Sequence, residues 1–288
     1  MYGLLFEQSK RARRVIGQPH GQPLRADGVY LPGGEGPLPP ADPRAAGALR
    51  FAMIGDSSAA GLGAEGPEHL PGVLIARHLA ADADRPVQLD TYAVSGSTTR
   101  SMAPQIGLAL TNPPDIALIM VGANDVMARI QPRESGELLA DSVGRLRKAG
   151  IAVVVGTCPD LGCVRPIPQP LRSIARAWAL AVARHQRAAV LRAGGHPVPL
   201  ADLLASEFLS KEEFFSIDQF HPSAAGYEAA AAVLLPAVCA AAGAWEAGAL
   251  PEPPTRSAAA DARRPTARLT EAANRRLERL ARRPGLAA

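Results

Sequence analysis

Two short loops carry the residue types needed for nucleophilic chemistry. Ser57 follows the apolar run "LRFAMIG" in the segment "GDSSAAGLG", where small residues leave its hydroxyl uncovered. A serine hydroxyl is a weak nucleophile at neutral pH and needs a base within hydrogen-bond reach, itself oriented by a third group. His221 in "DQFHP" is the candidate base. Asp218, three residues earlier, is placed to accept the ring N–H and to fix the tautomer whose other nitrogen takes the serine proton.

Other interpretations of these residues remain open. D-x-x-H-P is also typical of a turn that starts a helix, with Pro222 and Ser223 as entry and cap residues. His185 falls on the apolar face of a long predicted helix, where a packed histidine is expected. The remaining histidines lack a carboxylate at comparable spacing in a suitable loop: His20, His69, His78 and His196.

Acyl transfer also requires hydrogen-bond donors for the oxyanion that develops on the attacked carbonyl. Gly96 in "SGSTT" can offer a backbone N–H with no side chain in the way, and Asn124 in "GAND" can offer its side-chain amide. Taken singly, Gly96 is equally typical of a turn, and Asn124 with Asp125 of a helix cap. Four turns with suitable residues at one edge of a sheet favour the functional interpretation.

The elements that position these residues follow from the hydrophobic pattern. Five short apolar runs rich in Val and Ile predict buried parallel strands: "LRFAMIG", "VQLDTYAV", "DIALIMVG", "IAVVVGT" and "HPVPLADL". Longer amphipathic segments between them predict helices, and "SAAGYEAAAAVLLPAVCAAAG" predicts a closing helix. This alternation predicts a doubly wound α/β sandwich whose ligands bind at the carboxyl ends of the strands. Ser57, Gly96 and Asn124 all follow predicted strands there.

The ordered set resembles the SGNH hydrolases, also called GDSL-type esterases and lipases, over about residues 49 to 245. "GDSSAAGLG" is similar to the first block of that family, "AVSGSTT" to the second, "GAND" to the third and "DQFHP" to the last. The second block often begins with asparagine in the family, where this chain has "YAV". The resemblance implies a three-layer, flavodoxin-like α/β/α sandwich with a five-stranded parallel sheet.

The resemblance also implies a site and a reaction. Ser57, His221 and Asp218 would form the catalytic triad, and Ser57 N–H, Gly96 N–H and the Asn124 side chain the oxyanion hole, with Ser58 a bystander and with no metal or cofactor. The implied reaction is hydrolysis of carboxylic esters through an acyl-enzyme, with small acyl or lipid-like esters as substrates. Acyl transfer or thioester hydrolysis on the same triad is an alternative. A non-catalytic binding protein on the hydrolase fold is another.

Composition sets the remaining expectations. We expect an N-terminal helix and Pro/Gly-rich linker at 1–48, the hydrolase domain at 49–247, and a Pro-rich then Arg-rich tail at 248–288. The net charge of +4 comes from the ends, with nine arginines and four acids at 251–288, so it does not indicate nucleic-acid binding. The tail either contacts a membrane or partner through a basic amphipathic helix or is solvated, which we favour.

The three cysteines do not predict a disulfide framework, and Cys158 and Cys163 are interpreted as incidental thiols. No apolar run approaches the length that spans a bilayer, and the start of the chain does not resemble a signal peptide. A cytoplasmic protein, with peripheral membrane contact left open, is therefore expected.

Overall fold

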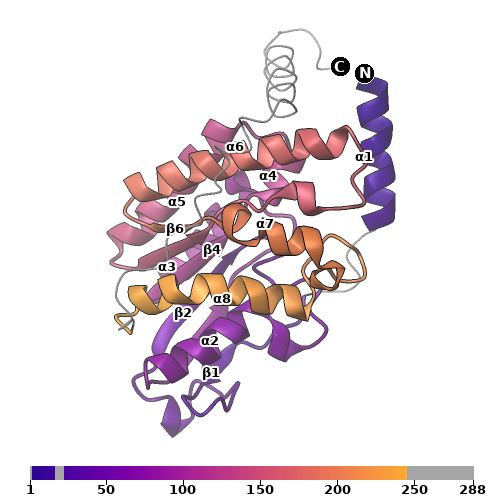
Figure 1. Cartoon of the computed structure of the whole chain (residues 1–288). Helices are drawn as coiled ribbons and strands as arrows, with labels where there is room; N and C mark the ends of the chain where they lie inside the picture. Colours follow the sequence, from indigo (N-terminus) through magenta and orange to yellow (C-terminus); the bar gives the residue numbers. More distant parts are fainter. Residues whose placement is uncertain (1, 17–22, 245–288) are drawn as a thin grey trace.

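The computed structural model describes residues 2–16 and 23–244 of the 288-residue chain. A six-stranded sheet lies between two layers of helices, with strand order β1-β3-β2-β4-β5-β6 (Figure 1). Its strands are β1 Gly28–Tyr30, β2 Leu49–Gly55, β3 Val87–Thr91, β4 Ile116–Met120, β5 Ala152–Gly156 and β6 His196–Val198. Strands β2 to β6 pair in parallel, and β1 pairs antiparallel with β3 at the edge. The predicted three-layer α/β/α fold is confirmed.

The helices cover the two faces of the sheet in the way the buried side chains require. They are α1 Tyr2–Ile16, α2 Pro71–Asp82, α3 Ala103–Thr111, α4 Ala123–Met127, α5 Pro132–Lys148, α6 Leu171–Arg192, α7 Leu200–Ser210 and α8 Ala224–Ala241. Odd-numbered residues of β2, such as Phe51 and Met53, pack with α2, α7 and α8. Even-numbered residues, such as Ala52 and Ile54, pack with α3, α5 and α6. A strand buried on both faces needs a continuous apolar run, which is the pattern seen in the sequence.

Two elements differ from the sequence-based prediction. The sheet has six strands instead of five, because Gly28–Tyr30, in the segment interpreted as a linker, forms β1 against β3. The run "HPVPLADL" is a strand only to Val198, and α7 begins at Leu200. Both elements depend on contacts with distant parts of the chain more than on local periodicity.

His185 is exposed on α6, so the prediction that it is packed is wrong. The face of α6 that packs into the core carries Val182, Gln186 and Ala189, and His185 lies outside this face.

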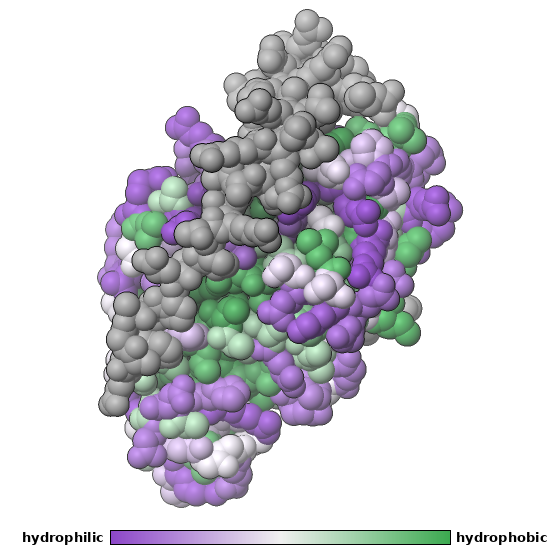
Figure 2. All heavy atoms as spheres, in the orientation of Figure 1, coloured by the Kyte–Doolittle hydropathy of each residue, from purple (hydrophilic) through white to green (hydrophobic). Residues whose placement is uncertain are grey.

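Helix α8 is long and apolar enough by length and composition to cross a membrane, contrary to our expectation that no such run exists. Its inner side contributes Tyr227, Leu234 and Val238 to the core, each 0% exposed, as expected for a core helix of the sandwich. On the face that α7 and α8 present, apolar side chains gather toward the middle and hydrophilic ones toward the rim (Figure 2). The cytoplasmic location stays a prediction.

Candidate active site

Ser57 lies directly beyond the carboxyl end of the central strand β2, in a loop that the sheet holds closely. The preceding Gly55 has φ +140°, and a Cβ atom there would overlap the carbonyl oxygen of Met120 on neighbouring β4. Glycine is therefore required where the chain leaves the sheet. After Ser57 the loop folds back on itself, because the N–H of Leu62 donates a 2.9 Å hydrogen bond to the carbonyl of Ser57. Ser57 itself is 7% exposed.

Ser57, His221 and Asp218 form a continuous chain of hydrogen bonds, although 164 residues separate the serine from the histidine. The Nε2 atom of His221 lies 3.0 Å from Ser57 Oγ, and its Nδ1 atom lies 2.6 Å from Asp218 Oδ2. The other oxygen of Asp218 accepts hydrogen bonds of 2.8 to 2.9 Å from the Ser216 hydroxyl and from the N–H groups of Phe220 and His221. The structure thus brings together Ser57, His221 and Asp218, the three residues that the sequence analysis predicted to act together.

The electrostatics of Asp218 determine where the proton on the imidazole lies. Burial would raise the pKa of Asp218, but the hydrogen bonds from His221, Phe220 and Ser216 together outweigh it and lower that pKa to about 2. An ionised carboxylate only accepts hydrogen bonds, so Nδ1 of His221 must carry the proton that Asp218 receives. In a neutral ring, Nε2 is then the acceptor for the Ser57 hydroxyl proton.

The loop that carries His221 serves two purposes at once. Ser223 is the N-cap of α8, and its hydroxyl accepts a hydrogen bond from the Gly226 N–H at 3.3 Å. The helix-start interpretation of "DQFHP" is therefore correct alongside the triad geometry. Gly63, with φ +97°, allows this loop to approach the Ser57 loop, because a Cβ atom there would lie 2.6 Å from the Pro222 carbonyl oxygen. The two halves of the site are thereby held against each other.

Gly96 lies in the loop after β3, and Asn124 lies in α4, within the connection between β4 and α5 that we call the Asn124 loop; the two segments are joined to each other and to the end of β2. Val94 N–H donates to the carbonyl of Gly55 at 3.1 Å, which fixes the Gly96 loop beside the Ser57 loop. Asn124 Nδ2 donates to the carbonyl of Ser97 at 3.1 Å. An amide NH₂ group has two hydrogens, so this bond leaves one of them for another acceptor. The Asn124 side chain therefore bridges loops and does not cap α4, whose start at Gly122 has no side-chain cap.

Behind these loops lies a buried polar network that the sequence analysis missed. Asp125, 0% exposed, accepts from Thr99 N–H and Thr99 Oγ1 at 2.9 Å each, and from Ser135 Oγ at 2.5 Å. Burial raises the pKa of Asp125, which these hydrogen bonds partly oppose. Gln186 of α6 accepts from Cys158 N–H at 2.8 Å and donates to the Val121 carbonyl at 3.3 Å and to Ser135 Oγ at 3.2 Å. The network ties the Asn124 loop to α5 and α6.

Gln105 of α3 supports the end of β2 and the Gly96 loop through similar hydrogen bonds. Its side chain accepts from Gly55 N–H at 2.8 Å and donates to Gly55 carbonyl at 3.0 Å and Ser97 Oγ at 2.8 Å. Gln105 and Gln186, which support the site in this way, are called the glutamine braces. The signal for both in the sequence was a glutamine on an otherwise apolar face of a predicted helix. Within residues 2–16 and 23–244, no group of three or more His, Cys, Asp or Glu side chains is arranged to hold a metal ion.

Comparison with known proteins gives a consistent result. Residues 53–229 match the model of the GDSL-like Lipase/Acylhydrolase family. The chain is 45% identical over 234 residues to the GDSL-like esterase Rv1075c of Mycobacterium tuberculosis (strain ATCC 25618 / H37Rv), covering 80% of this chain and 74% of that protein.

Among solved structures, TesA aligns with a TM-score of 0.56 at 20% identity, over 67% of this chain and 99% of that one. The lipase/acylhydrolase from Enterococcus faecalis aligns with a TM-score of 0.52 at 21% identity, over 65% and 93%. These two likenesses support the fold. The family match and the sequence relative show that this chain belongs to the GDSL-like lipase/acylhydrolase family and is a carboxylic-ester hydrolase.

Proposed function

We propose that the protein cleaves carboxylic esters through an acyl-enzyme formed on Ser57. The observation that carries this proposal is the unbroken hydrogen-bond chain from Ser57 Oγ through His221 to an ionised Asp218. His221 Nε2 takes the hydroxyl proton as Ser57 Oγ bonds to the ester carbonyl carbon. When the carbon–oxygen bond to the alcohol breaks, His221 returns that proton to the departing alkoxide. A water molecule activated by the same nitrogen then releases the acid and restores Ser57.

The oxyanion that forms in each step needs donors placed in advance. We assign this role to the N–H groups of Ser57 and Gly96 and to the second hydrogen of the Asn124 amide. The bond from Asn124 to the Ser97 carbonyl supports the assignment, because it holds the amide beside the Gly96 loop. The substrates proposed for this site are small acyl or lipid-like esters.

The first test replaces Ser57 with alanine. We expect Ser57→Ala to lower kcat/KM for p-nitrophenyl butyrate by at least about 10³-fold, because the nucleophile is lost while the fold stays intact. Ser210→Ala is the matched control, since within residues 2–16 and 23–244 the Ser210 hydroxyl bonds only to carbonyls of its own helix, those of Ser206 and Glu207. Rates are measured by nitrophenolate release. Retention of native activity by Ser57→Ala would show that another residue is the nucleophile.

A further inference from the structure

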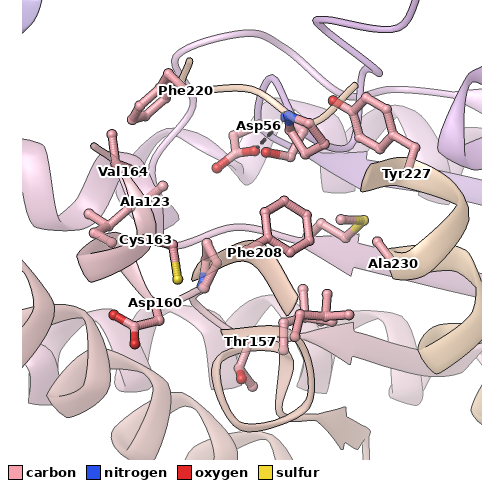
Figure 3. Close-up of a pocket in the computed structure, with 18 of the residues that line it drawn as sticks. Asp56, Ala123, Thr157, Asp160, Cys163, Val164, Phe208, Phe220, Tyr227 and Ala230 are labelled. Atoms are coloured by element: carbon pink, nitrogen blue, oxygen red, sulfur yellow. Dashed lines mark hydrogen bonds between the residues drawn. The ribbon is translucent and has the colours of Figure 1, made fainter. Parts of the chain in front are cut away.

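A pocket opens next to the Ser57–His221 pair, at the carboxyl ends of β4 and β5 and under α7 (Figure 3). The residues that line its upper part are the immediate neighbours of those assigned to the reaction. They are Asp56 and Ser58 around Ser57, Phe220 and Pro222 around His221, and Ala123 before Asn124. Ser58, interpreted from sequence as a bystander, is therefore part of a wall of this pocket. The pocket therefore borders the three chain segments that carry Ser57, His221 and Asn124, although these three residues do not themselves line it.

The rest of the wall is mostly hydrocarbon. It is built from side chains of β4, the loop after β5, α7 and α8, chiefly Met120, Leu161, Val164, Leu204 and Ala230. Leu161, Val164, Leu204 and Ala230 are each at most 7% exposed. Such a surface binds apolar groups by removing both partners from water.

Three polar side chains of the wall, those of Tyr227, Thr157 and Asp160, are already engaged with the protein. Tyr227 OH donates to the Leu62 carbonyl at 2.7 Å, and Thr157 Oγ1 donates to the Val198 carbonyl at 3.4 Å. Asp160 accepts from Gly162 N–H at 2.8 Å and pairs with Arg176 at 2.9 Å. A polar ligand would lose water here and gain few new hydrogen bonds, which costs free energy. The chemistry of the wall therefore selects a hydrocarbon.

Resting on the proposed function, we propose that this pocket holds the hydrocarbon chain of the acyl group and that Phe208 of α7 sets the chain length it accepts. Phe208 is half-buried and stands in the middle of the pocket, between the Asp56 side and the Thr157 side (Figure 3). Its ring is held edge-on to Phe214 at 5.3 Å and to Phe215 at 5.2 Å between centroids. Two such contacts restrict the ring, so it acts as a fixed stop for a chain that enters from Ser57.

The test compares p-nitrophenyl acetate with p-nitrophenyl decanoate. Phe208→Ala enlarges the pocket, and we expect it to raise the decanoate-to-acetate ratio of kcat/KM at least tenfold. Ala230→Leu narrows the pocket from α8, and we expect it to lower the same ratio at least fivefold. Leu209→Ala is the control on α7, because Leu209 is 46% exposed and does not line this pocket. Its ratio is expected to stay within twofold of native.

Acetate hydrolysis separates the possible failures. If the variants hydrolyse acetate with Ser57 dependence but keep the native ratio, the pocket does not hold the acyl chain and the proposed function stands. If Ser57→Ala retains acetate hydrolysis, the proposed function itself is wrong.

A binding measurement covers the case in which the variants lose activity altogether. We expect calorimetry to show decanoate binding to Ser57→Ala and at least fivefold weaker binding to the Ser57→Ala, Ala230→Leu double variant. Equal binding to both would overturn the assignment of the pocket.

Discussion

The carboxyl group of Asp56 lies one residue from Ser57 but takes no part in the Ser57–His221–Asp218 chain. It is 3% exposed, accepts a 2.9 Å hydrogen bond from Ser58 N–H, and faces the apolar pocket. Burial raises the pKa of Asp56 to about 6, and the charge of Asp125 adds to the rise, while the Ser58 N–H and the charge of His221 oppose it. Because the folded pKa is above the unfolded value, ionisation of Asp56 opposes folding.

The sign of this effect gives a prediction about pH. Between the unfolded pKa near 3.8 and the folded pKa near 6, the folded state holds the extra proton on Asp56, so the contribution of Asp56 to stability falls as pH rises. Asp56→Asn keeps an acceptor for Ser58 N–H and removes the titration. We expect the loss in unfolding free energy between pH 4 and 7 to be smaller in Asp56→Asn by up to about 3 kcal/mol. Urea denaturation at each pH measures it.

Asp141→Asn on the exposed side of α5 is the control and should follow the native pH dependence. Identical pH profiles for native protein and Asp56→Asn would mean that Asp56 titrates normally in the folded state.

At the scale of elements, the loops after β4 and β5 depend on helices that lie behind them. Gln186 of α6 bonds to backbone groups of both loops, Val121 and Cys158, and to Ser135 of α5. A buried amide that reaches three partners leaves several of them unsatisfied when it is removed. The position of Asn124 is thereby coupled to the packing of α5 against α6.

Gln186→Leu should show this coupling. It keeps the volume but leaves the Cys158 N–H and the Val121 carbonyl without partners, so we expect a loss of roughly 2 to 4 kcal/mol in unfolding free energy. We also expect lower kcat on p-nitrophenyl butyrate, because the Asn124 loop loses its support. Denaturation and kinetics are measured together, with exposed Arg187→Leu as control. A stable, fully active Gln186→Leu variant would contradict the proposal that Gln186 supports the Asn124 loop.

Some of these elements could be predicted from the sequence and others could not. The buried strands β2 and β4 were predicted because a strand covered on both faces must be apolar throughout, and the functional loops because chemistry requires particular residues after those strands. The glutamine braces were missed because their partners are backbone groups far away in the chain, 50 residues for Gln105 and Gly55. Strand β1 was missed because three residues carry no periodicity and their partner strand is about 60 residues away.

At the scale of the whole molecule, residues 23–48 are tied to the domain that the sequence analysis begins at residue 49. Tyr30 of β1 is 0% exposed, lies in the core shared with Phe51 and Leu79, and donates through its OH to the Ala26 carbonyl at 2.6 Å. Helix α1 is attached by hydrogen bonds of Gln8 to Gln169 and Leu171, and Ile16 packs against the cluster that contains Cys158 and Leu161. The predicted tail at 248–288 lies outside the described residues.

Tyr30→Ala tests whether this segment belongs to the folding unit. Removing a fully buried aromatic ring should cost about 3 to 5 kcal/mol of unfolding free energy, measured by denaturant titration. Leu24→Ala, at an exposed position of the same segment, should change it by less than about 0.5 kcal/mol. If both variants match the native protein, residues 23–48 are a dispensable linker and the boundary at residue 49 is correct as predicted.

The three cysteines are free and buried. Cys158 packs under the Asn124 loop, Cys163 lines the acyl pocket, and Cys239 lies in α8 against Asp82. Burial raises the pKa of Cys163 and of Cys239 to about 12, so neither presents a thiolate to reagents at neutral pH. A thiol reagent can therefore reach Cys158 and Cys239 only when their surroundings open, so their rates of modification would report local unfolding of the site and of α8 without any added label. The rate at Cys163 would instead report access to the pocket that it lines.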